Sequence, residues 1–208
     1  MAIQLAALAV VVTRPCCQRG ALTCTAWHDD DVLHGTATTL RPVTGDDVSR
    51  LAAILTHPAV ARWWPGYDEE RVRAELVDAD GTVVFAIEVA TGDAAGGTGG
   101  EAVVVGAVMF TEETSPDYRH ASIDVFLDSD WHGRGLGTDA VRTVARYLVH
   151  DRGHHRLAID PAVENARAIR TYERIGFRRV GVARRYERGG DGTWHDCLLM
   201  DLLAPELE

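Results

Sequence analysis

The chain is poor in cysteine, and its few cysteines form no pattern typical of a metal site or a disulfide framework. It has 4 cysteines in 208 residues, three near the N-terminus and Cys197 near the other end, without Cys-x-x-Cys pairs. Small disulfide-stabilised domains carry far more cysteine, and zinc sites use closely paired ligands. His154, His155 and His195 also lack the spacing of a metal site. The sequence therefore predicts reduced thiols, a cytoplasmic location and no bound metal.

Positive charge is also scarce. The chain has 31 acidic and 21 basic residues, which give a formal net charge of -10. Such a molecule repels phosphate backbones and anionic lipid surfaces, so nucleic acid and membranes are poor candidates for partners. An acidic surface attracts a cationic small molecule instead; alternatively, it serves only solubility.

The N-terminal segment predicts neither a membrane anchor nor a typical secretory signal. Its apolar run, Ile3 to Val12, has only about ten residues, too few to span a bilayer, and no Lys or Arg precedes it. We interpret residues 1–33 as a dispensable extension, with a weak signal peptide as the alternative.

The rest of the chain has no internal repeat and predicts one domain, residues 34–208. Strand-like runs lie at 36–42, 83–90, 102–110, 121–127, 155–160, 177–182 and 196–202. Helical spacing and capping residues predict helices after Thr44 and Asp68 and over 138–152 and 165–175. The glycine-rich stretch 92–100 precedes a strand, so it does not have the helix start that a phosphate-binding loop needs.

A second group of glycines lies where a predicted strand gives way to a predicted helix. His132, Gly133, Arg134, Gly135, Leu136 and Gly137 separate the strand ending near Asp128 from the helix starting near Thr138. At such a junction, successive backbone N–H groups converge on an anion, and the helix N-terminus adds partial positive charge. The stretch therefore predicts a pyrophosphate site; an ordinary glycine turn is the alternative.

The next helix carries the second motif. Asn165 caps it, Ala168 and Tyr172 share a face one turn apart, and Gly176-Phe177 end it. The hydroxyl of Tyr172 is a candidate general acid for a departing thiolate, and the alternative is a core aromatic with a solvent-reaching hydroxyl.

Together these stretches resemble the GCN5-related N-acetyltransferase (GNAT) superfamily, whose coenzyme motif R/Q-x-x-G-x-G/A precedes an Asn-to-Tyr-to-Gly-Phe helix. The resemblance covers about residues 36–203. One position departs from the motif, since His132 stands where the superfamily usually has Arg or Gln. Backbone amides make most of the phosphate contacts in this family, so we expect only a small effect.

The resemblance implies an α/β (α+β) fold, with a mixed, mostly antiparallel sheet splayed between two neighbouring parallel strands and flanked by helices. It implies acetyl-CoA as acyl donor, with the pantetheine arm between the strands of Leu127 and Ile159. A backbone N–H near Phe126 or Leu127 would polarise the thioester for direct attack by the amine. The implied coenzyme-binding residues are Phe126, Leu127, His132, Gly133, Arg134, Gly135, Leu136, Gly137, Thr138, Asn165, Ala168 and Tyr172.

The acceptor side is most similar to the aminoglycoside 6'-N-acetyltransferases. The similar stretches are His57-Pro58, Arg62-Trp63-Trp64, Glu112-Glu113-Thr114 with Pro116, Ile123-Asp124, Asp160-Pro161, Asn165 to Arg170 and Phe177. This resemblance implies that Asp124 and Tyr172 are catalytic, with Asp124 as base or amine-orienting group. It implies that Trp64, Glu113, Asp124 and Asp160 bind the acceptor. A polycationic acceptor also fits the chemistry, because one carboxylate deprotonates the amine while others hold the remaining ammonium groups.

Several alternatives stay open. Asp160 before Pro161 is also a plausible strand end, and Glu113 a solvated loop charge. Asp191 and Asp196 flank a last hairpin of undetermined register. The acceptor could instead be a lysine-type amine in a siderophore precursor or a protein N-terminus, and a non-catalytic acyl-CoA-binding module is a third reading. Both a monomer and a homodimer are compatible with the sequence.

Overall fold

A computed structural model describes residues 32–91 and 101–207, whose strands form one sheet with the order β1-β2-β3-β4-β5-β6-β8-β7. The strands are β1 Leu33–His34, β2 Thr39–Pro42, β3 Thr82–Thr91, β4 Glu101–Glu113, β5 His120–Leu127, β6 Arg156–Ile159, β7 Arg178–Arg188 and β8 Trp194–Leu203. The α-helices are α1 Val48–Thr56, α2 Pro58–Ala61, α3 Glu69–Val72, α4 Leu136–Arg146 and α5 Ala166–Ile175. The expectations for Ile3 to Val12, for the three N-terminal cysteines and for residues 92–100 fall outside the described residues.

Short helical turns extend several of these elements. A 3-10 turn, Gly45–Asp47, leads into α1, and π-helical turns continue α3 over Arg73–Val77 and α4 over Tyr147–Asp151. Further 3-10 turns are Ser129–Trp131 and Ala204–Glu206. Within residues 32–91 and 101–207, no helix is long and apolar enough to cross a membrane.

The predicted fold class is confirmed, including its one parallel contact. All neighbouring strands pair antiparallel except β5 and β6. That parallel pair is short, because it joins only Ala121 to Leu157 and Ser122 to Ala158. From Ile123 onward, β5 keeps its partner β4 but has left β6. The sheet is therefore split beside the residues expected to hold the pantetheine arm.

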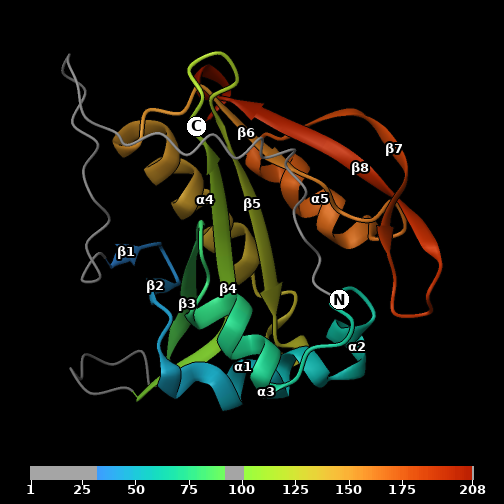
Figure 1. Cartoon of the computed structure of the whole chain (residues 1–208). Coiled ribbons are helices and arrows are strands. Elements are labelled where there is room, and N and C mark those ends of the chain that lie inside the picture. The colour runs from blue at the N-terminus through green and yellow to red at the C-terminus, as the bar shows by residue number, and fades with distance from the viewer. Residues whose placement is uncertain (1–31, 92–100, 208) are drawn as a thin grey trace.

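Helices cover both faces of the sheet (Figure 1). On one face, α4 and α5 pack against the larger core cluster, which includes Phe85, Phe110, Ile123 and Leu157. On the other face, α1 and α3 cover a second cluster that contains Phe126. Because successive residues of a strand point to opposite faces, Asp124 and Phe126 share the α1 side of β5. The Asp124 side chain thus points to the α1 side of the sheet.

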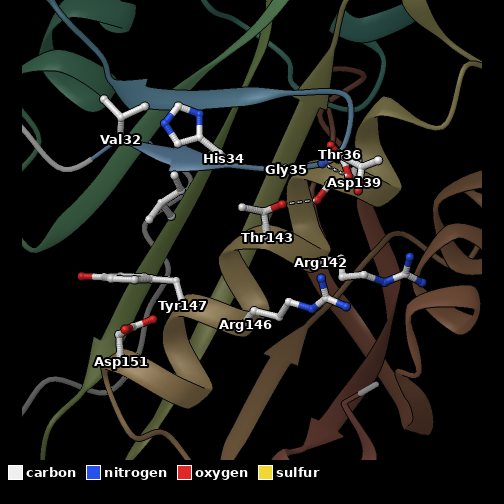
Figure 2. A pocket seen from close by; sticks show the side chains of 11 residues that line it. Val32, His34, Gly35, Thr36, Asp139, Arg142, Thr143, Arg146, Tyr147 and Asp151 are labelled. Atoms are coloured by element: carbon white, nitrogen blue, oxygen red, sulfur yellow. Dashed lines mark hydrogen bonds between the residues drawn. The ribbon is translucent and has the colours of Figure 1, made fainter.

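The start of the domain differs from the prediction of one strand over 36–42. Leu33 pairs with Leu40, and the intervening turn is held by the Asp139 carboxylate of α4, whose oxygens accept the backbone N–H groups of Thr36, Ala37 and Thr38 at 2.9 Å each. Figure 2 shows Thr36 and Asp139 of this contact beside a surface pocket between β1 and α4. The domain boundary expected at residue 34 therefore falls inside β1.

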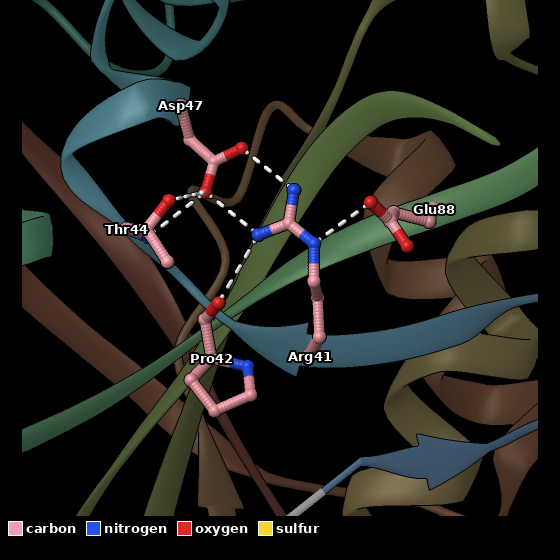
Figure 3. Close-up of polar contacts among 5 residues, drawn as sticks. All are labelled: Arg41, Pro42, Thr44, Asp47 and Glu88. Atoms are coloured by element: carbon pink, nitrogen blue, oxygen red, sulfur yellow. Dashed lines mark hydrogen bonds and ion pairs between the residues drawn. The ribbon is translucent and has the colours of Figure 1, made fainter. Parts of the chain in front are cut away.

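The predicted capping pair of Thr44 and Asp47 is present and belongs to a larger network (Figure 3). Arg41 of β2 donates two hydrogen bonds of 2.8 Å to the Asp47 carboxylate and one of 2.7 Å to Glu88 of β3. Burial would raise the pKa of Asp47, but the hydrogen bonds from Arg41 and Thr44 lower it on balance. The network fixes the start of α1 against the sheet.

Two further boundaries differ from the prediction for clear reasons. Pro58 ends α1 but also begins α2, because proline suits the first helical turn and His57 Nδ1 accepts the Ala59 N–H. The last hairpin is longer than predicted: β7 runs on to Arg188, and β8 begins at Trp194. Its outer half is exposed, so it lacks the alternating hydrophobic pattern by which a strand is detected.

Candidate active site

The glycines of the predicted phosphate loop have the backbone conformation that such a loop needs. Gly133 and Gly135 have φ values of +78° and +82°, in the left-handed region that side-chain-bearing residues avoid. Gly135 caps α4, which begins at Leu136, two residues earlier than the sequence suggested. A Cβ placed on either glycine would meet no atom within 4 Å. The loop therefore leaves open space in front of a helix N-terminus, which fits a phosphate group.

The flanking residues of the loop bind one another. His132 Nε2 lies 3.0 Å from the Leu127 carbonyl, at the end of β5, and its Nδ1 lies 2.8 Å from Nη1 of Arg167. Arg134 stacks on the Trp131 ring, with its guanidinium carbon 4.6 Å from the ring centroid. These contacts connect the loop to both β5 and α5.

The second motif helix has the predicted cap. Asn165 Oδ1 accepts the Ala168 N–H at 3.1 Å, and Gly176, with φ +120°, ends α5. Tyr172 is buried and packs edge-on against Phe177, with their ring centroids 6.1 Å apart. Burial, with the nearby charges of Asp124 and Asp160, raises the pKa of Tyr172. Its hydroxyl therefore keeps its proton at neutral pH, as a general acid must.

Asp124 and Asp160 come together where the sheet splits. Asp124 lies on β5 just beyond its last pairing with β6, and Asp160 directly follows β6. Burial raises the pKa of Asp124 well above its usual range, and the charges of Asp160 and Glu187 raise it further. Carboxylates that interact in this way disfavour one another's negative charge, so the pair favours the binding of a cation or a proton.

The third carboxylate of this group comes from β7 and was not predicted from the sequence. A register shift between Ala183 and Glu187 makes β7 bulge, and Arg185 takes a positive φ of 50° there. The Asp196 carboxylate holds the bulge by accepting the Arg185 N–H at 2.7 Å. Bulges near sites commonly redirect side chains. Here the bulge turns two neighbouring residues of β7 toward the split in the sheet.

Tyr186 and Glu187 are those two residues. The Tyr186 hydroxyl bonds to the Asp160 carboxylate, and burial with this carboxylate raises the pKa of Tyr186 to about 12. Glu187 Oε2 accepts from the buried Cys197 thiol at 3.7 Å. Burial and the charge of Glu187 raise the pKa of Cys197 to about 12, so this thiol stays protonated and is a poor nucleophile.

Aromatic residues close the opposite wall. Trp64 lies against Phe126, with ring centroids 5.3 Å apart, and against Tyr67, at 6.0 Å. The hairpin between β7 and β8 reaches this wall, since a Cβ on Gly190 would meet Pro65 Cβ at 2.8 Å. The wall and the hairpin thus border the carboxylate group from two sides.

The structure does not bring every predicted site residue to this place. Met109 of β4 pairs with Asp124, whereas Glu113 lies four residues further along β4, opposite His120, and accepts the Ser115 N–H at 2.7 Å. Asp191 sits in the β7–β8 turn, where it accepts from Thr193 and His195. A role for Glu113 in acceptor binding stays a prediction from the sequence alone.

Glu112, next to Glu113 at the C-terminal end of β4, forms an ion-pair cluster of its own. Arg152 and the buried His154 both bond to its carboxylate, at 2.8 and 2.6 Å. The His154 hydrogen bond, followed by the Arg152 contacts, outweighs burial and lowers the pKa of Glu112 to about 2. Within the described ranges, no group of three or more His, Cys, Asp or Glu residues is arranged to hold a metal ion.

Comparison with known proteins places this geometry in a family. The model of the acetyltransferase (GNAT) domain matches residues 38–178. Aminoglycoside N(6')-acetyltransferase type 1 of Klebsiella pneumoniae is 32% identical over 152 residues, 69% of this chain and 75% of the relative. The ribosomal protein uS5-alanine N-acetyltransferase of Escherichia coli strain K12 is 26% identical over 106 residues, 51% of this chain and 54% of the relative.

A solved structure of aminoglycoside acetyltransferase AAC(6')-Ib in complex with coenzyme A has the same fold, with a TM-score of 0.62 at 24% identity over 80% of this chain and 95% of that one. The open phosphate loop, the capped Tyr172 helix and the split sheet agree with the family match. The chain belongs to the GNAT family and is an N-acetyltransferase.

Proposed function

We propose that this enzyme transfers the acetyl group of acetyl-CoA to an amino group of an aminoglycoside, as a 6'-N-acetyltransferase. The observation that carries the proposal is the group of three carboxylates, Asp124, Asp160 and Glu187, beside the split between β5 and β6. An aminoglycoside carries several ammonium groups, so it offers one amine for reaction and others for these carboxylates. The sequence similarity to the Klebsiella pneumoniae enzyme supports the same acceptor.

The donor side fits acetyl-CoA, which supplies an activated acetyl thioester when bound. The glycines of the loop leave room for a phosphate in front of α4, and a helix N-terminus offers backbone N–H groups that bind such an anion. Phe126 and Leu127 lie on the part of β5 that has left β6, where the backbone is available to an extended ligand. Asp128 donates its N–H to the Val105 carbonyl of β4, and N–H groups alternate sides along a strand, so the Leu127 N–H points away from β4 and is the better candidate for polarising the thioester carbonyl.

The residues of the site divide the proton transfers between them. Asp124 accepts the proton that the acceptor ammonium must lose before its nitrogen attacks, and its raised pKa suits a base that works near neutral pH. Tyr172 gives its proton to the sulfur as the carbon–sulfur bond breaks. Asp160 and Glu187 hold ammonium groups that do not react. Cys197 takes no covalent part, because its thiol stays protonated.

The direct test is a product assay with labelled acetyl-CoA against kanamycin-type aminoglycosides, a lysine-type amine and a peptide with a free N-terminal alanine. We expect acetylated aminoglycoside, with the label on the 6'-amine by mass spectrometry or NMR. Acetylation of another acceptor alone would reject the aminoglycoside assignment but keep the transfer chemistry. Absence of coenzyme binding by calorimetry would reject acetyl-CoA use itself.

A protein N-terminus is the second candidate acceptor. The similarity to the ribosomal protein uS5-alanine N-acetyltransferase favours it, although that match spans about half of each chain. A peptide brings a single reacting amine, so it uses Asp124 but has less need of Glu187 and Asp160. The proposed cytoplasmic site of action and the choice between monomer and homodimer rest on the sequence expectations alone.

A further inference from the structure

Arg167 lies in the first turn of α5. Its guanidinium is held by His132, the residue at which this chain differs from the coenzyme motif of the family. Nη1 of Arg167 donates to Nδ1 of His132 at 2.8 Å. Arginine has no acceptor atom, so Nδ1 carries the lone pair and the ring proton sits on Nε2, which donates to the Leu127 carbonyl at 3.0 Å. His132 therefore bridges β5 and α5 as a neutral imidazole with a fixed tautomer.

The surroundings of the ring favour this neutral form. Burial and the Arg167 charge lower the pKa of His132, while the Leu127 carbonyl and Asp128 oppose the shift. His57, near the start of α2, also lowers it. A neutral His132 brings no positive charge of its own to the loop. An arginine at this position of the motif would bring one.

Arg167 supplies a charge at this point instead. The other cation of the loop, Arg134, is drawn toward Trp131 and the Asp130 carbonyl, 3.2 Å from its Nη2. Arg167 stands beside the loop through its bond to His132, is exposed, and has further N–H donors free to point outward. A guanidinium so held loses less freedom when it binds a phosphate than an unrestrained one.

We propose that Arg167 binds a phosphate group of the coenzyme and that His132 is the positioning residue that holds it there. The proposal rests on the proposed use of acetyl-CoA. It explains how the loop tolerates histidine in place of arginine or glutamine. Arg167 of α5 makes the phosphate contact instead, and the acceptor nitrogen of His132 holds the Arg167 guanidinium in position. A neutral imidazole and a glutamine amide share the needed pair of groups, one acceptor and one donor.

The test is calorimetric titration of coenzyme A into purified variants, with thermal unfolding to confirm that each is folded. Arg167→Ala should weaken binding about tenfold, the loss of one charge-assisted phosphate contact. His132→Ala should weaken it by a similar factor, because Arg167 is then released. His132→Gln should restore affinity close to that of the parent. Arg174→Ala, on the same helix two turns further on, is the control and should leave affinity unchanged.

A crossed pair of variants separates positioning from simple packing. In a His132→Arg background the new guanidinium provides its own charge and no acceptor, so adding Arg167→Ala should change coenzyme affinity less than twofold, against about tenfold in the parent. Titration with 3'-dephospho-CoA identifies the phosphate. If Arg167→Ala no longer weakens the binding of 3'-dephospho-CoA, Arg167 contacts the 3'-phosphate. If the variant still weakens that binding, Arg167 contacts the pyrophosphate.

Two results would overturn the inference while leaving acetyl-CoA use intact: parent affinity in Arg167→Ala, or binding by His132→Gln as weak as by His132→Ala. If the parent enzyme itself binds no coenzyme A, the proposed function fails and this inference fails with it.

Discussion

Burial raises the pKa of Asp124 and the charge of Asp160 raises it further, although Asp160 directly follows β6 and β5 has already left that strand at Asp124. The two carboxylates face the same gap because β5 and β6 pair over only two residues and then diverge. The separation of the strands thus both opens space for a thioester and brings together acidic groups for a cationic amine. In the GNAT fold of this enzyme, one topological feature creates the two halves of the site.

The coupling of the two carboxylates predicts a pH dependence. A base must be ionised, and Asp124 ionises at a higher pH than an ordinary aspartate, so kcat/KM should rise with pH through that raised pKa. Asp160→Asn removes a nearby negative charge and should move this acidic limb to lower pH. The exposed Asp80→Asn is the control and should leave the limb in place. An unmoved limb in Asp160→Asn would remove Asp124, or its coupling to Asp160, from the rate-limiting ionisation.

Tyr172→Phe tests the general acid. The hydroxyl acts only as the thiolate leaves, so turnover should fall by roughly 10²–10⁴-fold while coenzyme affinity stays close to that of the parent. Steady-state kinetics and calorimetric titration of coenzyme A measure the two effects separately. The edge-on packing with Phe177 needs only the ring, so the variant should stay folded. Parent-like turnover would leave Tyr172 with a packing role.

The N-terminal boundary gives a prediction about stability. Deletion of residues 1–31 should leave a folded, active enzyme, because the described residues 32–91 and 101–207 already form two hydrophobic clusters among themselves. Deletion of residues 1–33 also removes Leu33, which packs partly buried on the core and pairs with Leu40. We expect that longer deletion to cost about 1 kcal/mol of unfolding free energy, measured by urea denaturation. Equal stability of the two proteins would show that β1 contributes nothing.

The sequence predicted those parts of the site that short segments define. The glycines of the loop and the Asn165 cap act through neighbouring residues, so their spacing in the chain was enough. The position of the turn after Gly35 was not predictable in this way, because it depends on Asp139, about a hundred residues away. Tertiary contacts of this kind leave no periodic pattern in the chain.

The sequence did not identify Glu187 and Tyr186 as site residues, for a related reason. Their direction depends on the bulge at Arg185, which the Asp196 carboxylate holds from the neighbouring strand. A change of one residue in strand register sends every side chain to the opposite face, so the sequence alone could not decide which acidic residue of the hairpin faces the acceptor. The prediction considered Asp191 and Asp196, whereas in the structure Glu187 lies close enough to Asp124 to add to the rise in pKa that burial causes.

The acceptor assignment leads to contrasting effects for two aspartates. Asp124→Asn keeps the shape but removes the charge and basicity, so kcat should fall by roughly 10²–10⁴-fold with every amine and should not recover at saturating acceptor. The same variant should unfold at a higher temperature at neutral pH. Asp124 binds its proton more tightly in the folded than in the unfolded protein. The protonated side chain therefore stabilises the fold, and this stabilisation is lost as pH rises through the raised pKa of Asp124. Asparagine carries no titrating carboxyl group, so the variant avoids that loss.

Asp160→Asn should mainly raise KM for aminoglycosides with several amines and change kcat less, because its contact with the acceptor exists before and during the reaction. The rise should shrink in high salt, where charges near solvent are screened, and should be small for an acceptor with one amine. Kinetics of both variants with an aminoglycoside and with a single-amine acceptor measure the contrast. A normal kcat in Asp124→Asn would eliminate it as the base. Failure of the parent enzyme to acetylate any aminoglycoside would shift the assignment of the three carboxylates toward a lysine-type or N-terminal amine.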